Sequence, residues 1–109
     1  MTYRLIDVTA LTQALQKFAD ERNWERFHSP KNLAMALSVE VAELVEIFQW
    51  RTEAESRAAK DDVAVKQAAA DEIADVIIYA TRLADKLGID IDDAIERKLA
   101  KNAKKHPVS

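Results

Sequence analysis

The chain has 109 residues, a formal net charge of −3 and no cysteine. This length suits one domain over residues 1–109, and the absence of cysteine excludes disulfides and thiolate metal sites and favours a cytoplasmic protein. The net charge argues against a nucleic-acid polymer as partner, and no apolar run approaches the ~20 residues needed to cross a membrane.

The composition is typical of a helical protein, with one glycine, two prolines and abundant Ala, Leu, Glu and Lys. The first predicted helix runs from about Val8 to Arg22, because Leu11, Leu15 and Phe18 recur on one face. The polar and aromatic stretch NWERFH follows it and is predicted to form an irregular turn.

The second predicted helix has a clear start signal. Ser29 is a suitable N-cap, and Pro30 takes the first helical position, where its missing N–H costs nothing. The helix continues to about Trp50. Residues 51–63 are charged and poorly periodic, which predicts a connection with room for a helical turn of its own.

The third predicted helix runs from about Val65 to Leu87 and ends at Gly88, the residue best suited to a left-handed C-cap. Asp90 then caps a fourth helix, with Asp93 as its partner in an arrangement like a capping box. Two long amphipathic helices flanked by two shorter ones predict an all-α fold, a four-helix bundle.

Carboxylates lie within the apolar stripes of both long helices. At about 100° per residue, Glu40 falls between Leu44 and Ile47, and Glu43 lies at the edge of the same stripe. Helix three repeats the pattern, with Glu72 in its stripe and Asp75 towards one edge, as the sequence shows. Antiparallel packing of the two helices can therefore bring all four acids together.

Buried ionised carboxylates are costly unless they are protonated, paired with basic side chains or bound to a cation. For a single acid, an ordinary ion pair or a partly wet edge is the alternative, but two matched pairs favour a metal site. An all-oxygen ligand set suits Mg²⁺, with Mn²⁺ as a substitute. A di-iron bundle would normally carry Glu-x-x-His on its core helices, whereas the spacing Glu25 to His28 falls in the stretch predicted as an irregular turn and His106 does not follow a glutamate at this spacing.

Mg²⁺ held by carboxylates commonly completes its shell with water and phosphate oxygens, which points to phosphate chemistry. The fourth helix offers Lys98, Asn102 and Lys105 at i, i+4 and i+7, in line with Ile91 and Ile95. These side chains are candidates for binding phosphate oxygens. The alternative is a solvated basic helix end, which the helix dipole also favours.

Aromatic residues that can stack on a nucleobase occur in three places. Trp24, Phe27 and His28 precede the second helix, Trp50 closes it, and Tyr79 lies one turn beyond Asp75. For each ring taken singly, the alternative to ligand contact is packing in the core. Grouped in a loop, the first three are candidates for substrate contact.

These segments resemble a known family. NWERFHSPKNLAMALSVEVAELVEIFQW, DEIADVIIY and KLAKNAKKHP are similar to the MazG-like all-α nucleoside triphosphate pyrophosphohydrolases, with the dCTP pyrophosphatase type as the nearest subgroup. The likeness extends from about Leu11 to Pro107. The family signature E-x-x-E, a spacer and E-x-x-D falls on the four acids already singled out, Glu40, Glu43, Glu72 and Asp75.

The resemblance implies Mg²⁺-dependent hydrolysis of a nucleoside triphosphate to the monophosphate and pyrophosphate, in house-cleaning of dCTP-like or non-canonical deoxynucleotides. It implies that the four acids are both catalytic and metal-binding, and that the segment 24–28, Trp50 and Tyr79 form a base pocket. It also implies that Lys98 and Asn102 assist with phosphates, and that the chain forms a homodimer or homotetramer with sites near subunit interfaces.

Two positions depart from the family pattern. Leu15 stands where dCTP-type enzymes carry a histidine beside the base, and Val39 stands where some members have a further acid. Val39 and Val45 on the back of helix two add to the expectation of an oligomer. Two rival functions remain open at this point: a non-enzymatic interaction module whose acids pair with a basic partner, and a carboxylate-bridged redox site.

Overall fold

The computed structural model describes residues 4–108; residues 1–3 and 109, at the ends of the predicted domain, lie outside it. Every regular element in this range is helical, which confirms the all-α prediction. None of the described helices combines the length and the apolar character required to span a membrane. The elements are α1 (Thr9–Glu21), η1 (Glu25–Phe27), α2 (Pro30–Phe48), α3 (Glu53–Ala58), η2 (Ala59–Asp61), α4 (Val63–Lys86) and α5 (Ile91–Lys105), where η marks a 3-10 turn.

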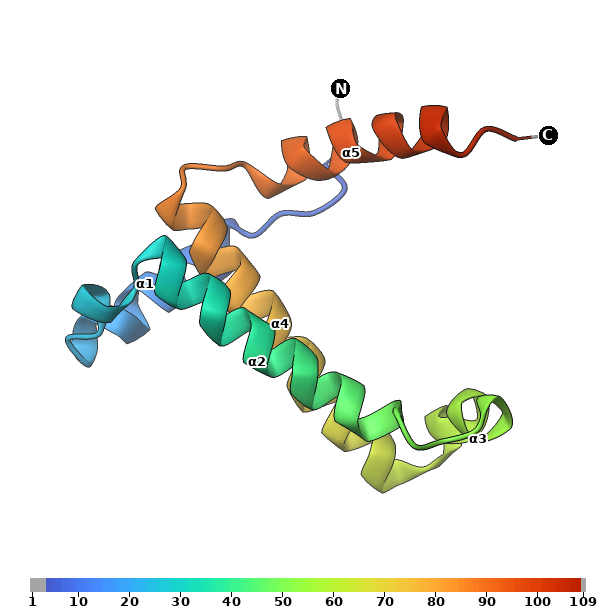
Figure 1. Cartoon of the computed structure of the whole chain (residues 1–109). Helices are drawn as coiled ribbons and strands as arrows, with labels where there is room; N and C mark the ends of the chain where they lie inside the picture. Colours follow the sequence, from blue (N-terminus) through green and yellow to red (C-terminus); the bar gives the residue numbers. More distant parts are fainter. Residues whose placement is uncertain (1–3, 109) are drawn as a thin grey trace.

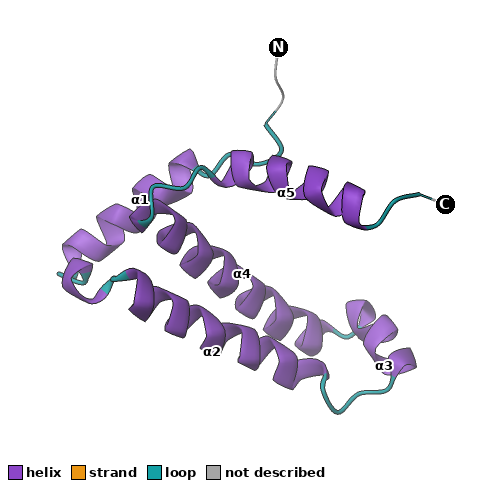
Figure 2. Ribbon diagram, turned by 45° about the horizontal axis from the view of Figure 1, so that its top comes forward, coloured by secondary structure: helices purple, strands orange, loops and turns teal. Residues whose placement is uncertain are grey.

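The two long helices α2 and α4 are antiparallel and lie side by side along their lengths (Figure 2). Helix α1 packs against α4 near the end of the pair where α2 begins, and α3 with η2 closes the opposite end (Figure 1). Helix α5 extends away from the pair in both views. The predicted four-helix bundle is therefore not closed within the described residues, because α5 does not pack extensively against either long helix.

Helix α2 starts as predicted, with the Ser29 hydroxyl accepting a hydrogen bond from the backbone N–H of Asn32 at 3.2 Å. It ends two residues earlier than predicted, at Phe48. Thr52 and Glu55 then form a reciprocal capping box. The backbone N–H of Glu55 donates to the Thr52 hydroxyl at 3.1 Å, and the backbone N–H of Thr52 donates to the Glu55 carboxylate at 2.9 Å. This local signal begins α3, so the predicted connection contains an additional short helix.

Helix α4 begins at Val63, two residues before the predicted start, because the Asp62 carboxylate accepts hydrogen bonds from the backbone of the next turn. Its C-terminus confirms the role of Gly88, which has a φ of 66°. The N–H of Gly88 donates to the Asp85 carbonyl and that of Ile89 donates to the Ala84 carbonyl, which is a Schellman motif. Glycine adopts this left-handed conformation without a steric penalty.

Helix α1 ends in the same motif, with Asn23 in the left-handed position at a φ of 55°. The N–H of Trp24 donates to the Ala19 carbonyl at 2.9 Å, and the N–H of Asn23 donates to the Asp20 carbonyl at 3.2 Å. The reversal brings the Trp24 ring edge-on to Phe18, with 5.5 Å between ring centroids. The segment predicted as an irregular turn is thus an ordered reversal followed by η1.

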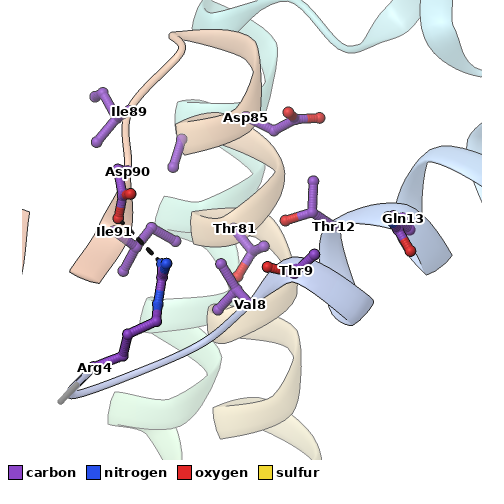
Figure 3. A pocket seen from close by; sticks show the side chains of 11 residues that line it. Arg4, Val8, Thr9, Thr12, Gln13, Thr81, Asp85, Ile89, Asp90 and Ile91 are labelled. Atoms are coloured by element: carbon purple, nitrogen blue, oxygen red, sulfur yellow. Dashed lines mark ion pairs between the residues drawn. The ribbon is translucent and has the colours of Figure 1, made fainter. Parts of the chain in front are cut away.

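The N-terminal segment is held against the start of α5. The Asp92 carboxylate accepts hydrogen bonds from the backbone N–H groups of Leu5 and Ile6 at 2.6 and 3.1 Å. Arg4 and Asp90 form an ion pair at 3.5 Å beside a cavity of about 310 Å³ (Figure 3). This cavity lies among the N-terminal segment, α1 and the end of α4, and none of the predicted site residues lines it.

The buried apolar core is small for a chain of this length. Its members are Ala19, Leu33, Ala59, Val65 and Ala84. The radius of gyration is 16.8 Å, whereas a compact domain of this length has a radius of about 13 Å. Much apolar surface of the long helices consequently faces outwards.

Candidate metal centre and adjoining cavity

Three of the four predicted acids meet where α2 and α4 pack together. Glu40 and Glu43 lie one turn apart on α2, and Glu72 reaches them from α4. Each offers a carboxylate oxygen, and these oxygens all lie within 4.8 Å of one another. We call these three residues the acidic cluster.

Two oxygens of the acidic cluster are buried without a partner. Oε2 of Glu40 and Oε2 of Glu72 are inaccessible to solvent and have no hydrogen-bond partner among the described residues. An ionised carboxylate can only accept hydrogen bonds, so no rearrangement among these acids satisfies both groups. A proton or a cation must compensate for the lost solvation.

The electrostatics of the acidic cluster point the same way. Contact with the Glu72 carboxyl, then burial, then the neighbouring Glu43 and Asp75 raise the pKa of Glu40 to about 7. The contact with Glu40 lowers the pKa of Glu72, but burial and the charges of Glu43 and Asp75 outweigh it, so that this pKa is raised as well. The facing pair therefore retains a proton near neutral pH when nothing else neutralises it.

Asp75 lies beside the acidic cluster and outside the 4.8 Å group. It follows Glu72 by one turn on α4, and its charge contributes to the raised pKa of Glu40. Its side chain lines the cavity next to the cluster. Asp75 thus stands at the junction between the acids and that cavity.

The residues present fit a hard divalent cation. Among residues 4–108 the grouped ligands at this site are all carboxylates, and this donor set is the one that Mg²⁺ and Mn²⁺ prefer. The orphaned oxygens of Glu40 and Glu72 are the observation in favour of a cation. A second acidic group at the start of α5, around Asp92, is accounted for by the backbone hydrogen bonds that Asp92 accepts.

The adjoining cavity has a volume of about 320 Å³ and is mainly apolar and aromatic. We call it the aromatic cavity; it is lined by Leu15, Phe18, Ala19, Trp24, His28, Asp75, Ile78, Tyr79 and Arg82. The Trp24 and His28 rings stand edge to face with centroids 6.4 Å apart. Three of the residues predicted to contact the base, Trp24, His28 and Tyr79, are thus brought together next to Asp75.

Two other predicted aromatic contacts lie elsewhere. Phe27 is exposed and its ring lies 4.6 Å from the guanidinium of Arg26. Trp50 follows the end of α2 and is 87% exposed. Neither residue lines the aromatic cavity within the described chain.

The predicted phosphate-binding residues Lys98, Asn102 and Lys105 lie on α5, which points away from the helix pair (Figure 2). None of them lines the aromatic cavity or the cavity beside Glu43 and Glu72. Within a single chain they are not brought to the acids.

Arg82 is a site residue that the sequence interpretation missed. Its side chain is only 3% exposed, yet it lines the aromatic cavity and hydrogen-bonds to His28, Gln16 and Glu25. Its position gave a usable signal, because it follows Tyr79 by three residues and therefore shares the helix face that Tyr79 presents to the cavity.

Comparisons with known proteins agree with this geometry. A sequence model described as the MazG-like family matches residues 35–109. The chain is 40% identical over 92 residues to dCTP pyrophosphatase 1 of Rattus norvegicus, and 40% identical over 91 residues to dCTP pyrophosphatase 1 of Homo sapiens. Each match covers 84% of this chain and 54% of the relative, so the chain spans about half the length of the curated relatives it matches.

A solved structure is similar over nearly the full length. The crystal structure of a pyrophosphatase from Archaeoglobus fulgidus superposes with a TM-score of 0.80 at 38% sequence identity. The match covers 99% of each chain. The overall fold is therefore shared with an experimentally determined structure.

Proposed function

The chain belongs to the MazG-like family, and we propose that it is a Mg²⁺-dependent nucleoside triphosphate pyrophosphohydrolase. The reaction is hydrolysis of a nucleoside or deoxynucleoside triphosphate to the monophosphate and pyrophosphate. The observation that carries the proposal is the pair of orphaned carboxylate oxygens on Glu40 and Glu72 beside a cavity of nucleobase size. The names of the rat, human and archaeal relatives support the same activity.

Glu40, Glu43, Glu72 and Asp75 are the proposed metal ligands, with Mg²⁺ as the cation and Mn²⁺ as a substitute. When bound, the cation would neutralise phosphate oxygens and make water more acidic. The carboxylates of the chain hold the cation, orient the attacking water and accept its proton.

The aromatic cavity is the proposed site for the base. Its volume of about 320 Å³ lies at the lower end of the range for small-molecule sites, and its walls include the rings of Trp24, His28 and Tyr79. Stacking on such rings is worth about 1–3 kcal/mol per base. Asp75, which lines the same cavity, places the acids next to the bound nucleotide. We assign dCTP-like or non-canonical deoxynucleotides as substrates, in house-cleaning of a cytoplasmic nucleotide pool.

A second copy of the chain completes the site in this proposal. The exposed apolar residues on the long helices include Met35, Val39, Val45, Ile73 and Ile77. A homodimer or homotetramer that buries them would supply the core that one chain lacks. It would also give α5 a surface to pack against. In such an assembly, bound nucleotide can be reached by the α5 residues Lys98, Asn102 and Lys105. It can also be reached by Phe27 and Trp50, which lie outside the aromatic cavity of a single chain.

The experiment is a screen of nucleoside triphosphates with Mg²⁺ in which monophosphate, pyrophosphate and inorganic phosphate are measured separately. We expect monophosphate and pyrophosphate in equal amounts. Glu43→Gln should abolish turnover, whereas the matched control Glu53→Gln, on the exposed helix α3, should retain it. Release of inorganic phosphate alone, or no turnover of any triphosphate, would contradict the proposal.

A further inference from the structure

The buried guanidinium of Arg82 joins α4 to the two segments that form the opposite wall of the aromatic cavity. Its Nε donates to Nδ1 of His28 at 3.0 Å, and Nη1 donates to the side-chain oxygen of Gln16 on α1 at 2.6 Å. Its Nη2 donates to the Glu25 carboxylate in η1. One side chain therefore fixes the loop that carries Trp24 and His28 relative to the helix that carries Asp75 and Tyr79.

The charges around the buried guanidinium of Arg82 are balanced by neighbouring side chains. Glu25 and Asp85 supply two carboxylates, the latter with its Oδ2 3.5 Å from Nη1 of Arg82. Lys86 also forms an ion pair with Glu25 and supplies the second positive charge. A buried charge is tolerated when it is paired and hydrogen-bonded in this way.

This geometry determines where the proton of His28 resides. A guanidinium has donors and no acceptor, so the Nδ1 atom that it contacts must carry a lone pair. The imidazole is then neutral and its single proton is on Nε2. Burial and the charge of Arg82 lower the pKa of His28, which favours the same neutral ring. Among the described residues no group accepts a hydrogen bond from Nε2.

His28 lines the aromatic cavity together with three other polar side chains, Asp75, Tyr79 and Arg82. Asp75, when ionised, can only accept hydrogen bonds, and Leu15 and Ile78 contribute apolar wall. Because Arg82 occupies Nδ1, Nε2–H is the donor that the His28 ring retains for a ligand of this cavity.

We propose that Arg82 is a positioning residue that locks His28 in its neutral Nε2–H form, so that His28 donates one hydrogen bond to an acceptor of the bound nucleobase, a ring carbonyl or an unprotonated ring nitrogen. This inference rests on the proposed function for the identity of the ligand. It adds a specificity element: the site favours bases that present an acceptor to His28 over analogues that lack it, because an unpaired buried donor is costly.

The first test is a spectroscopic measurement on the protein without substrate. Long-range ¹H–¹⁵N NMR of the His28 ring near neutral pH should give a protonated Nε2 and an unprotonated Nδ1. Arg82→Met should convert the fixed form into a mixture of the two neutral forms. Arg57→Met, the same change at an exposed ion pair of α3, should leave it unaltered. A proton on Nδ1 in the unsubstituted chain, or an unaltered ring in folded Arg82→Met, would overturn the proposal. If Arg82→Met does not fold, the spectrum of the unsubstituted chain decides alone.

The second test compares a pyrimidine triphosphate substrate with its analogue lacking a ring carbonyl oxygen. For the parent substrate, His28→Phe should raise KM by about 3- to 10-fold, the worth of one hydrogen bond, with a smaller effect on kcat. The analogue should bind equally well to the unsubstituted chain and to His28→Phe. Equal losses for parent and analogue would contradict the role of His28. Absence of pyrophosphate release from every triphosphate would contradict the proposed function, whereas the NMR result tests the Arg82 contact independently of turnover.

Discussion

Glu40 of α2 and Glu72 of α4 face each other across the helix pair, and each has one carboxylate oxygen buried without a hydrogen-bond partner. Two acids in this position oppose the stability of the metal-free chain, since a like charge and lost solvation both disfavour ionisation. Their position between the two long helices supports the proposed cation site. The first predictions follow from this relationship.

Removing the charge of either facing acid should separate stability from activity. For Glu40→Gln we expect turnover to fall by about 100-fold or more, the scale of losing an electrostatic group in an active site. The melting temperature without metal should be unchanged or higher, because the neutral amide removes the repulsion. Thermal melts and pyrophosphate release measure the two effects, with Glu53→Gln as control. A metal-free Glu40→Gln that melts well below the unsubstituted chain would show that the carboxylate is a structural group.

The stability of the metal-free protein should fall as the pH rises through neutrality. The folded-state pKa of Glu40, about 7, lies above its ordinary value of 4.5, so the folded chain binds this proton more tightly than the unfolded chain. The resulting stabilisation is complete below the ordinary value and is lost as the pH rises towards 7. Melts over this range in the presence of a chelator measure the effect. A flat profile from acid to neutral pH would contradict the shared proton.

Mg²⁺ should reverse that loss, because the cation competes with the proton for the same oxygens. We expect Mg²⁺ to raise the melting temperature more at about pH 8 than at about pH 5.5, where the facing pair is protonated. At a hundredfold excess over its Kd the ion adds about 2.7 kcal/mol to the free energy of unfolding. Glu72→Gln should reduce the shift. An equal shift at both pH values would indicate that Mg²⁺ binds away from the acidic cluster.

The ring of Trp24 should contribute to substrate binding more than to the chemical step. Trp24→Ala should raise KM by about 5- to 100-fold, the equivalent of one lost stacking contact, with a smaller change in kcat. Trp24→Phe keeps a ring and should recover most of the loss. Steady-state kinetics on the best triphosphate measures both constants. Unchanged KM in Trp24→Ala would place the base outside the aromatic cavity.

The uncovered apolar surface of α2 should be an interface between copies of the chain. We expect the protein to sediment as a dimer or tetramer and Val39→Glu to shift it towards the monomer with loss of turnover, since a charge would be buried there. The matched control is Val63→Glu, because Val63 is 84% exposed at the first position of α4. Analytical ultracentrifugation measures the outcome. A monomer that is fully active would contradict the assembled site.

Sequence periodicity predicted the long helices and the meeting of their acids because both depend on local geometry. A repeat of 3.6 residues places Glu40 and Glu72 on the packed faces regardless of the rest of the chain. For the segment that contains α3 the sequence predicted only a connection with room for a helical turn, although the capping pair Thr52 and Glu55 is visible in the sequence. Its six residues show no apolar stripe, so capping rather than packing defines it.

The Arg82 network could not be predicted because its partners are distant in sequence. His28, Glu25 and Gln16 lie 54, 57 and 66 residues away from it. Local patterns give no information about pairing over such separations. The direction of α5 was unpredictable for a related reason: among the described residues it does not pack extensively against another helix that would fix its direction.

The turn at Asn23 makes the aromatic cavity sensitive to insertions within α1, whereas insertions between α2 and α3 leave it unchanged. Trp24 is positioned by backbone hydrogen bonds to the last residues of α1, so its ring follows that helix as a rigid extension. Adding one residue within α1 would swing the ring by about 100° around the helix axis and remove it from the wall beside Leu15. The same addition between α2 and α3 would only lengthen a surface connection. Natural or engineered length variation is therefore expected at the far end of the helix pair and not between Leu15 and Trp24.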